Sequence, residues 1–105
     1  MVRYRITNKA VADLSNIWNY TYSKWSEDQA DKYYQMLLDT CQQIADNPDL
    51  GKDYSIVIDK LLGFRAGRHI IFYTSIDGGE IEVLRILHEQ MDLGNRLHDK
   101  YALLR

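Results

Sequence analysis

Two helix patterns follow one another between residues 7 and 48, and only a short turn separates them. In the first pattern, apolar residues recur at three- and four-residue spacing as far as Lys24 or Trp25, on one face of a helix. Ser26 then begins a capping box, because its hydroxyl can accept a hydrogen bond from the amide of Gln29. Helices joined by so short a turn must lie antiparallel. The apolar stripes comprise Ala10, Leu14, Ile17, Trp18, Thr21 and Trp25 in the first helix, and Ala30, Tyr34, Leu37, Cys41, Ile44 and Ala45 in the second.

The two ends of this helical hairpin are also marked in the sequence. Thr7 suits the N-cap of the first helix. Asn47 ends the second helix, because Pro48 pushes the residue before it out of the α region. Ahead of the hairpin, residues 2–6 alternate between apolar and arginine side chains. This alternation predicts a first strand with one buried face.

Beyond Gly51 the pattern changes from the helical period to that of strands. The last strand is apolar on both faces, which predicts an interior position in the sheet. A pair of glycines before it predicts a hairpin turn, because glycine accepts positive φ at low cost. The predicted segments are residues 54–58 as an edge strand or an extended connection, 61–66 and 68–76 as strands, 77–80 as the turn and 80–87 as the last strand.

These elements predict a single α+β domain over residues 1–105, with the order β-α-α-β-β-β. An antiparallel helical hairpin is expected to pack on a three- to four-stranded antiparallel sheet. Residues 92–105 are expected to form a tail or a short helix, because apolar residues recur there with helical spacing.

Charge limits what the chain can bind. Its formal net charge is −2, whereas a domain that grips nucleic acid is usually positive, so we expect no direct specific DNA binding. Residues 8–47 hold three lysines against six acids, while arginines lie on the predicted strands. This predicts either an acidic hairpin facing a sheet that carries guanidinium groups, or a solvated surface of mixed sign. The strand arginines are Arg3, Arg5, Arg65, Arg68 and Arg85.

The chain shows no sign of a leader, a membrane span or a metal site. Residues 1–6 are too short and too charged for a signal peptide, and no apolar run is long enough to cross a bilayer. Cys41 is the single cysteine, and its helical apolar context predicts a buried thiol. His69, His88 and His98 lack the spacing of metal ligands. We therefore expect a cytoplasmic protein without metal or cofactor.

Several short stretches together resemble one family. Residues 63–65 read GFR, residues 67–73 read GRHIIFY and residues 84–88 read LRILH. The chain closely resembles the ParE branch of the RelE/ParE toxin superfamily, the plasmid-stabilisation proteins, from Tyr4 to about Leu97. The resemblance implies a toxin of a type II toxin–antitoxin pair that inhibits DNA gyrase by binding. It also implies a ParD-like antitoxin with a DNA-binding N-terminal part and a flexible C-terminal segment.

The resemblance further implies two binding surfaces and no catalytic residue. The antitoxin segment is expected to place a helix in a groove and to add a strand to a sheet edge, which gives a toxin–antitoxin hetero-oligomer. Aromatic and arginine side chains would anchor these contacts. The expected antitoxin contacts are Trp18, Tyr22, Trp25, Arg65, Arg68 and Arg85, and the residues expected to inhibit the target are Leu93, Arg96, Leu97 and Tyr101.

The alternative is a ribosome-dependent mRNA interferase of the RelE type. Such an enzyme would use Arg65 and Arg85 on the phosphate, and His88 as acid or base, with His69 as a second imidazole. The acidic net charge and the few lysines near the second strand argue against it. In structural roles, His88 would be a satisfied histidine at a strand end, and Arg85 would be tied to a carboxylate or a carbonyl. A third possibility is a decayed relative that serves only as an antitoxin sink.

Overall fold

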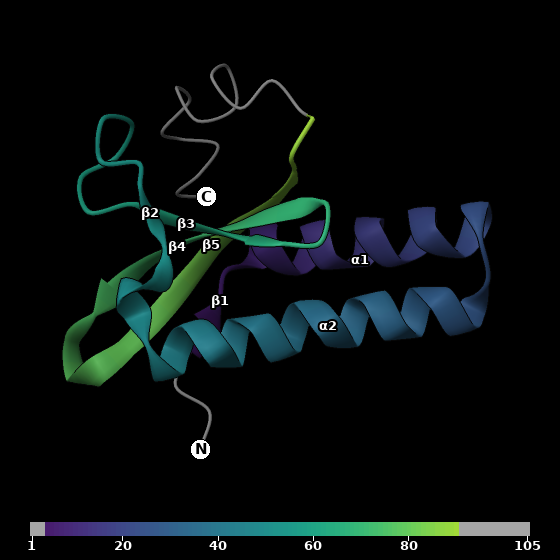
Figure 1. The fold of residues 1–105 in the computed structure, drawn as a ribbon, viewed down its shortest axis with the longest axis horizontal. Helices are drawn as coiled ribbons and strands as arrows, with labels where there is room; N and C mark the ends of the chain where they lie inside the picture. The colour runs from purple at the N-terminus through teal and green to yellow at the C-terminus, as the bar shows by residue number, and fades with distance from the viewer. Residues whose placement is uncertain (1–3, 91–105) are drawn as a thin grey trace.

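The structure is a computed structural model that describes residues 4–90, apart from the side chain of Asp77 (Figure 1). Arg3, His98 and the predicted tail, with Leu93, Arg96, Leu97 and Tyr101, lie outside the described residues. The predicted α+β class and the element order are confirmed. The elements are β1 (Tyr4–Ile6), α1 (Asn8–Lys24), α2 (Glu27–Asp46), the 3-10 turn η1 (Pro48–Leu50), β2 (Lys52–Asp53), β3 (Leu62–Ala66), β4 (His69–Ile76), the 3-10 turn η2 (Asp77–Gly79) and β5 (Glu80–His88).

The helical hairpin forms as predicted, with α1 and α2 antiparallel and side by side (Figure 1). The hydroxyl of Thr7 accepts from the Ala10 amide at 3.1 Å and so caps α1. Ser26 caps α2 in the same way, because its Oγ accepts from the Gln29 amide at 3.1 Å. These side chains satisfy amide groups that a helix N-terminus would otherwise leave without partners. Both predicted caps are confirmed.

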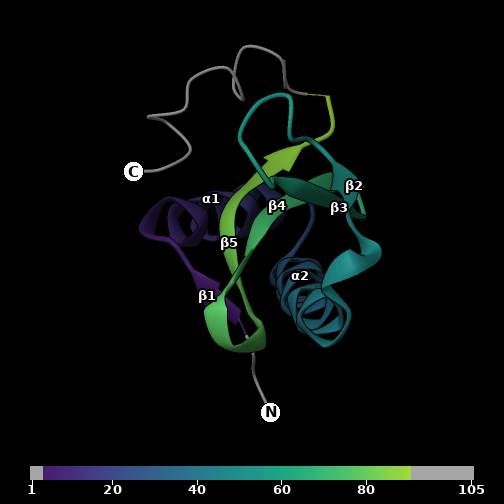
Figure 2. The ribbon, with the colours of Figure 1, turned by 90° about the vertical axis from the view of Figure 1, so that its left-hand side faces the viewer.

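The sheet is larger than predicted and mixed. Five strands lie in the order β1-β5-β4-β3-β2. β1 runs parallel to β5, with Tyr4 opposite Ile81, while every other pair is antiparallel. Figure 2 shows β1 at the margin of the sheet beside β5. The predicted three- to four-stranded antiparallel sheet is therefore corrected. The predicted interior position of the last strand is confirmed, because β5 lies between β1 and β4.

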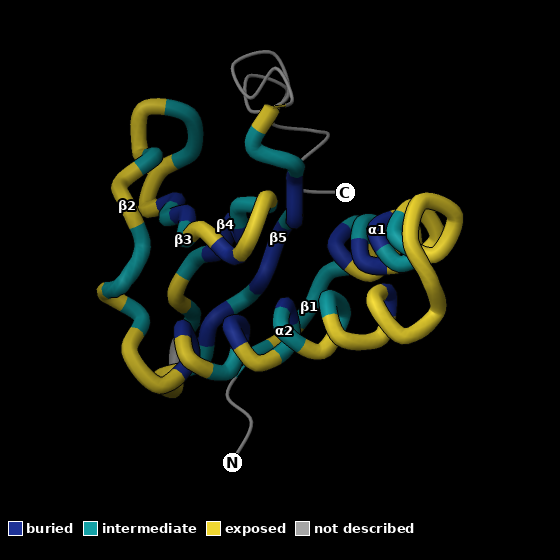
Figure 3. The backbone as a smooth tube through the Cα atoms, turned by 45° about the vertical axis from the view of Figure 1, so that its right-hand side comes forward, coloured by how far each residue is buried: buried dark blue, intermediate teal, exposed yellow. Residues whose placement is uncertain are grey.

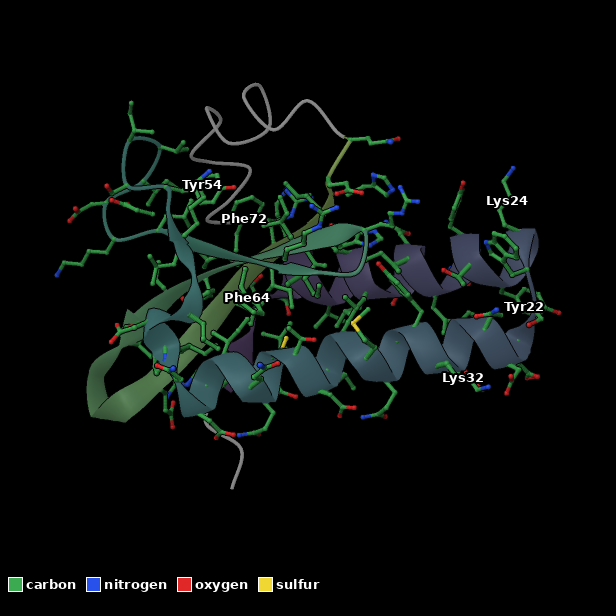
Figure 4. All side chains as sticks on the ribbon, viewed as in Figure 1. Tyr22, Lys24, Lys32, Tyr54, Phe64 and Phe72 are labelled. Carbon is green, nitrogen blue, oxygen red and sulfur yellow. The ribbon has the colours of Figure 1, made fainter. Side chains whose placement is uncertain are left out.

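Residues 54–58 form neither an edge strand nor an extended connection. The edge strand next to β3 is β2, which ends at Asp53, and turns follow it as far as Lys60. Tyr54 folds over the sheet, and its ring meets that of Phe72 edge-on at 5.1 Å between centroids (Figure 4). Val57 and Ile58 pack with Tyr54 against the group of buried residues that contains Phe72. The segment is apolar because it covers the sheet as a loop, so the strand prediction is wrong.

The main core lies between the helical hairpin and the sheet, as the buried stretches in Figure 3 indicate. The predicted burial of Cys41 is confirmed, and desolvation raises the pKa of its thiol to about 12. A smaller cluster forms around Leu61, Phe72, Leu84 and Leu87. No helix among residues 4–90 is long and apolar enough to cross a membrane. The main core contains Ala10, Leu14, Ile17, Leu37, Cys41, Ile44, Ala45, Ala66, Ile71, Tyr73, Ile81, Val83 and Ile86.

Candidate binding groove

A groove of about 640 Å³ lies between α1, the start of α2 and the end of β5. This volume is within the range typical of ligand sites. We call it the α1–β5 groove. One face of α1 forms its first wall, and α2 contributes Gln29 and Tyr33. The residues that line it from α1 and its C-cap are Asp13, Asn16, Ile17, Tyr20, Thr21 and Trp25, and those from the sheet and its turn are Arg68, His69, Arg85, Ile86, Leu87 and His88.

Two aromatic side chains stand exposed along this groove. Tyr20 is 63% exposed and Trp25, the C-cap of α1, is 74% exposed. Residues of these types bury a large rigid surface when a partner covers them, and they dominate the energetics of many interfaces. The groove therefore offers unburied apolar area next to polar groups of the sheet.

An ion pair links the two walls. Arg85 Nε donates to Asp13 Oδ2 at 2.8 Å, and Arg85 Nη2 donates to Asp13 Oδ1 at 3.0 Å. The side chains are only 11% and 12% exposed, and the Asp13 bond raises the pKa of Arg85. Asp13 Oδ2 also accepts from the amide of Ile86 at 2.9 Å. β1 stops pairing with β5 at Val83, so the Asp13 carboxylate satisfies an amide beyond the end of that pairing.

Two histidines lie at the sheet end of the groove. His69 of β4 and His88 of β5 are cross-strand neighbours, and their rings meet edge-on with centroids 5.1 Å apart. Tyr33 Oη lies 2.6 Å from His69 Nδ1 and accepts from the Arg68 amide at 3.0 Å. Burial is the main cause that lowers the pKa of His69 to about 4, and His88 adds to it. His69 is therefore a neutral imidazole at neutral pH.

An arginine pair borders the histidines. Arg65 Nη2 donates to Glu89 Oε1, and Arg68 Nη1 lies 3.5 Å from Glu89 Oε2. Glu89 is 17% exposed at its side chain, whereas the arginines are 67% and 70% exposed. A backbone hydrogen bond also holds Glu89 next to Arg68, because the Glu89 amide donates to the Arg68 carbonyl at 2.8 Å. Two guanidinium groups thus share one carboxylate at the rim.

The structure brings half of the predicted antitoxin contacts into this groove. Trp25, Arg68 and Arg85 all line it. Trp18 and Tyr22 do not line it; their rings stack on each other with centroids 5.2 Å apart. Figure 4 places Tyr22 near the turn between the helices, away from Phe72. Arg65 is held by Glu89 and is not among the lining residues.

The residues named for the nuclease alternative are also divided. Arg85 and His88 line the groove, and His69 joins them, while Arg65 does not. The expectation that a carboxylate ties Arg85 is confirmed by Asp13. His88 Nδ1 accepts from the Gln90 amide at 3.0 Å, as expected of a structural histidine. Within the described range 4–90, no three metal-ligating side chains come together.

Sequence reasoning missed several groove residues. Neither Asp13 nor Tyr20 is among the site residues that the sequence predicts. The signal was helical spacing, because Asp13, Ile17 and Tyr20 lie four and three residues apart on one face of α1. Tyr33 joins α2 to the sheet through its bond to His69. Only the folded chain shows that β5 faces this side of α1.

Comparison with known proteins agrees with this architecture. Residues 4–93 match the family model described as the ParE toxin of the type II toxin–antitoxin system parDE. Toxin ParE1 of Mycobacterium tuberculosis is 35% identical over 95 residues, which cover 90% of this chain and 97% of that protein. Toxin ParE1 of Caulobacter vibrioides is 33% identical over 92 residues, covering 88% and 94% of the two chains.

A solved structure shares the fold. It is described as a chromosomal ParDE TA system from P. aeruginosa, and it matches with a TM-score of 0.70 at 20% identity. The match covers 84% of this chain and 96% of that one. At this identity the structural match shows a shared fold only. Family membership rests on the sequence matches to the family model and to the two toxins. The chain belongs to the ParE toxin family of type II toxin–antitoxin systems.

Proposed function

We propose that this chain is a cytoplasmic toxin that acts by binding and is neutralised by a ParD-type antitoxin seated in the α1–β5 groove. The single observation that carries this proposal is the groove itself, with Tyr20 and Trp25 exposed beside it. A helix of the antitoxin that covers these rings would bury the largest exposed aromatic surfaces of α1. The names of the related toxins and of the ParDE structure support the same partner.

The edges of the sheet offer a second mode of contact. β1 and β2 are the outer strands, and β2 contains only Lys52 and Asp53. A strand from the antitoxin added to one edge would continue the ladder and hold the helix in place in the groove. The assembly would be a toxin–antitoxin hetero-oligomer.

Binding is favoured over catalysis by the state of the groove's polar groups. Asp13 holds the Arg85 guanidinium through two hydrogen bonds, so its charge is already compensated. The net charge of −2 also opposes close contact with ribosomal RNA. We therefore assign no catalytic residue, and we propose DNA gyrase as the target on the strength of family membership. The residues expected to inhibit it remain Leu93, Arg96, Leu97 and Tyr101.

Two measurements test the proposal. The chain should co-purify in a stable complex with the ParD-type product of the neighbouring reading frame, and the complex should lack toxicity. The purified chain should inhibit gyrase supercoiling, and added antitoxin should restore it. New cleavage sites in ribosome-bound mRNA, lost in His88→Gln, would instead establish the interferase. Growth arrest with supercoiling unaffected would exclude gyrase as the target.

A further inference from the structure

Three hydrogen-bond donors gather at the sheet end of the α1–β5 groove, and the ion pair of Asp13 and Arg85 does not use them. They are the imidazoles of His69 and His88 and the guanidinium of Arg68, which we call the donor cluster. All three line the groove. Arg68 precedes His69 in the chain, and His69 is paired with His88 across the strands. The cluster therefore combines three adjacent positions of the fold.

Hydrogen bonds engage the Nδ1 atom of each ring and leave Nε2 as the second nitrogen. Tyr33 Oη accepts from the Arg68 amide and lies 2.6 Å from His69 Nδ1, and in the Nε2–H tautomer of His69 the hydroxyl donates to this nitrogen. The second acceptor near Tyr33, the Ala66 carbonyl, is more distant at 3.5 Å. His88 Nδ1 accepts from the Gln90 amide. A neutral imidazole that accepts at Nδ1 carries its proton on Nε2. With His69 in this tautomer, both rings carry their N–H at Nε2, and both rings line the groove.

The charges around the cluster favour an anion. Asp13 is the one acid among the described residues that line the groove, and Arg85 compensates it. Glu89 faces the cluster from the end of β5, but Arg65 and Arg68 share its carboxylate. The two arginines and Glu89 together carry one net positive charge, and of the three residues Arg68 lines the groove. Its side chain is 70% exposed, so a ligand in the groove can reach the guanidinium.

We propose that the donor cluster is a subsite for one carboxylate side chain, an Asp or Glu of the antitoxin segment that occupies the groove. The inference rests on the proposed function and deepens it. A carboxylate accepts up to four hydrogen bonds through two oxygens, which matches two imidazole N–H groups and one guanidinium fork. A single carboxylate brings one charge, whereas a nucleic acid brings many, and the chain's net charge of −2 repels a polyanion.

The first test needs no antitoxin. The full-length chain, labelled with ¹⁵N, is titrated with acetate while the imidazole nitrogens are followed by NMR. Saturable shifts of the Nε2 resonances of His69 and His88 are expected, and Arg68→Gln should weaken the apparent affinity about tenfold. Arg5→Gln is the matched control, since Arg5 is also 70% exposed and paired with a glutamate, Glu80, but lies outside the groove. It should leave the titration unchanged.

The second test identifies the carboxylate on the partner. Each acid of the antitoxin's C-terminal segment is changed to its amide, and the dissociation constant is measured against the native chain and against Arg68→Gln. Substitution of one of these acids should raise the dissociation constant about tenfold with the native chain and leave it almost unchanged with Arg68→Gln, because the two changes remove the same contact. With Arg5→Gln, substitution of the same acid should raise the dissociation constant about tenfold, as it does with the native chain.

The outcomes separate this subsite from the proposed function. Tight antitoxin binding without any acid coupled to Arg68, or no saturable acetate shift, would overturn the subsite and leave the function standing. Failure of the antitoxin to bind would overturn the function, and the acetate shifts would then support only a carboxylate site. If inorganic phosphate or a short oligoribonucleotide shifts the same resonances with a higher apparent affinity than acetate, the carboxylate assignment is overturned in favour of a phosphate ligand.

Discussion

Asp13 and Arg85 lie 72 residues apart in the sequence and meet through two parallel hydrogen bonds of 2.8 and 3.0 Å. The pair joins α1 to β5, and both residues line the α1–β5 groove. Its fork geometry fixes the orientation of both side chains, because two bonds constrain rotation as well as distance. The same carboxylate accepts the Ile86 amide, so Asp13 also completes the edge of β5.

Asp13→Ala should destabilise the fold strongly. It leaves the Arg85 guanidinium buried beside an amide that has lost its acceptor, and removal of one partner of a buried pair costs about 3–5 kcal/mol. The double variant Asp13→Leu/Arg85→Met should recover part of that free energy of unfolding. Urea denaturation measures both. A loss under about 1 kcal/mol for Asp13→Ala would show that water compensates the guanidinium instead.

Acid should weaken the fold through His69. The pKa of this imidazole is about 4 in the folded chain and about 6.5 in the unfolded chain. Between these values the unfolded chain binds the additional proton, so stability falls as pH falls from about 6.5 to 4. After allowance for partial solvent exposure, the contribution is about 1–2 kcal/mol.

The variant His69→Gln isolates this contribution. Glutamine can still accept from the Tyr33 hydroxyl but does not titrate. The free energy of unfolding should therefore fall more steeply with acid in the native chain than in the variant, and urea titrations at several pH values give the difference. Parallel curves for the two proteins would contradict the assigned burial of a neutral imidazole.

Cys41 should resist thiol reagents in the folded state. Its side chain is fully buried, and its pKa of about 12 leaves almost no thiolate at pH 8. Iodoacetamide should react only through unfolding, so the rate should rise with urea in proportion to the unfolded fraction. Modification in native buffer at the rate of a free thiol would show that the core opens locally around α2.

Gly67 should be less tolerant of alanine than Gly78. Both have positive φ, +59° and +84°, and share the cost of a left-handed conformation. A Cβ on Gly67 would lie 2.8 Å from Tyr33 Oη, whereas one on Gly78 would touch nothing within 4 Å. Gly67→Ala should therefore lower stability by at least about 1 kcal/mol more than Gly78→Ala, as measured by urea denaturation. Equal losses would mean that Tyr33 yields without cost.

The local elements of the fold were predictable because short-range chemistry specifies them. Thr7 and Ser26 cap the helices where the sequence indicates, and Pro48 follows the end of α2. The pairing of β1 was not predictable, because a strand of three residues carries no information about its partner. Its parallel register with β5 depends on how the hairpin returns the chain to the sheet.

The groove shows the same division between local and long-range information. Helical spacing can relate Ile17 to Tyr20, since both lie on one face of α1. No local pattern relates Tyr33 to His69, because their bond depends on how α2 packs beside β4. The segment around Tyr54 was misjudged for a similar reason. Its apolar residues indicate burial, and burial over the sheet by a loop looks in sequence like a strand.

The most direct test of antitoxin binding in the α1–β5 groove compares Tyr20→Ala with Tyr22→Ala by calorimetric titration of the ParD-type antitoxin. Both residues are exposed tyrosines of α1, 63% and 53%, but only Tyr20 lines the α1–β5 groove. The family resemblance names Tyr22 as an antitoxin contact, so the comparison also decides between that expectation and the groove. Tyr20→Ala should raise the dissociation constant about 30-fold, the cost of losing a buried aromatic anchor. Tyr22→Ala should change the dissociation constant less than about twofold. Weaker binding for Tyr22→Ala with Tyr20→Ala unaffected would place the antitoxin on the other face of α1 and contradict binding in the α1–β5 groove.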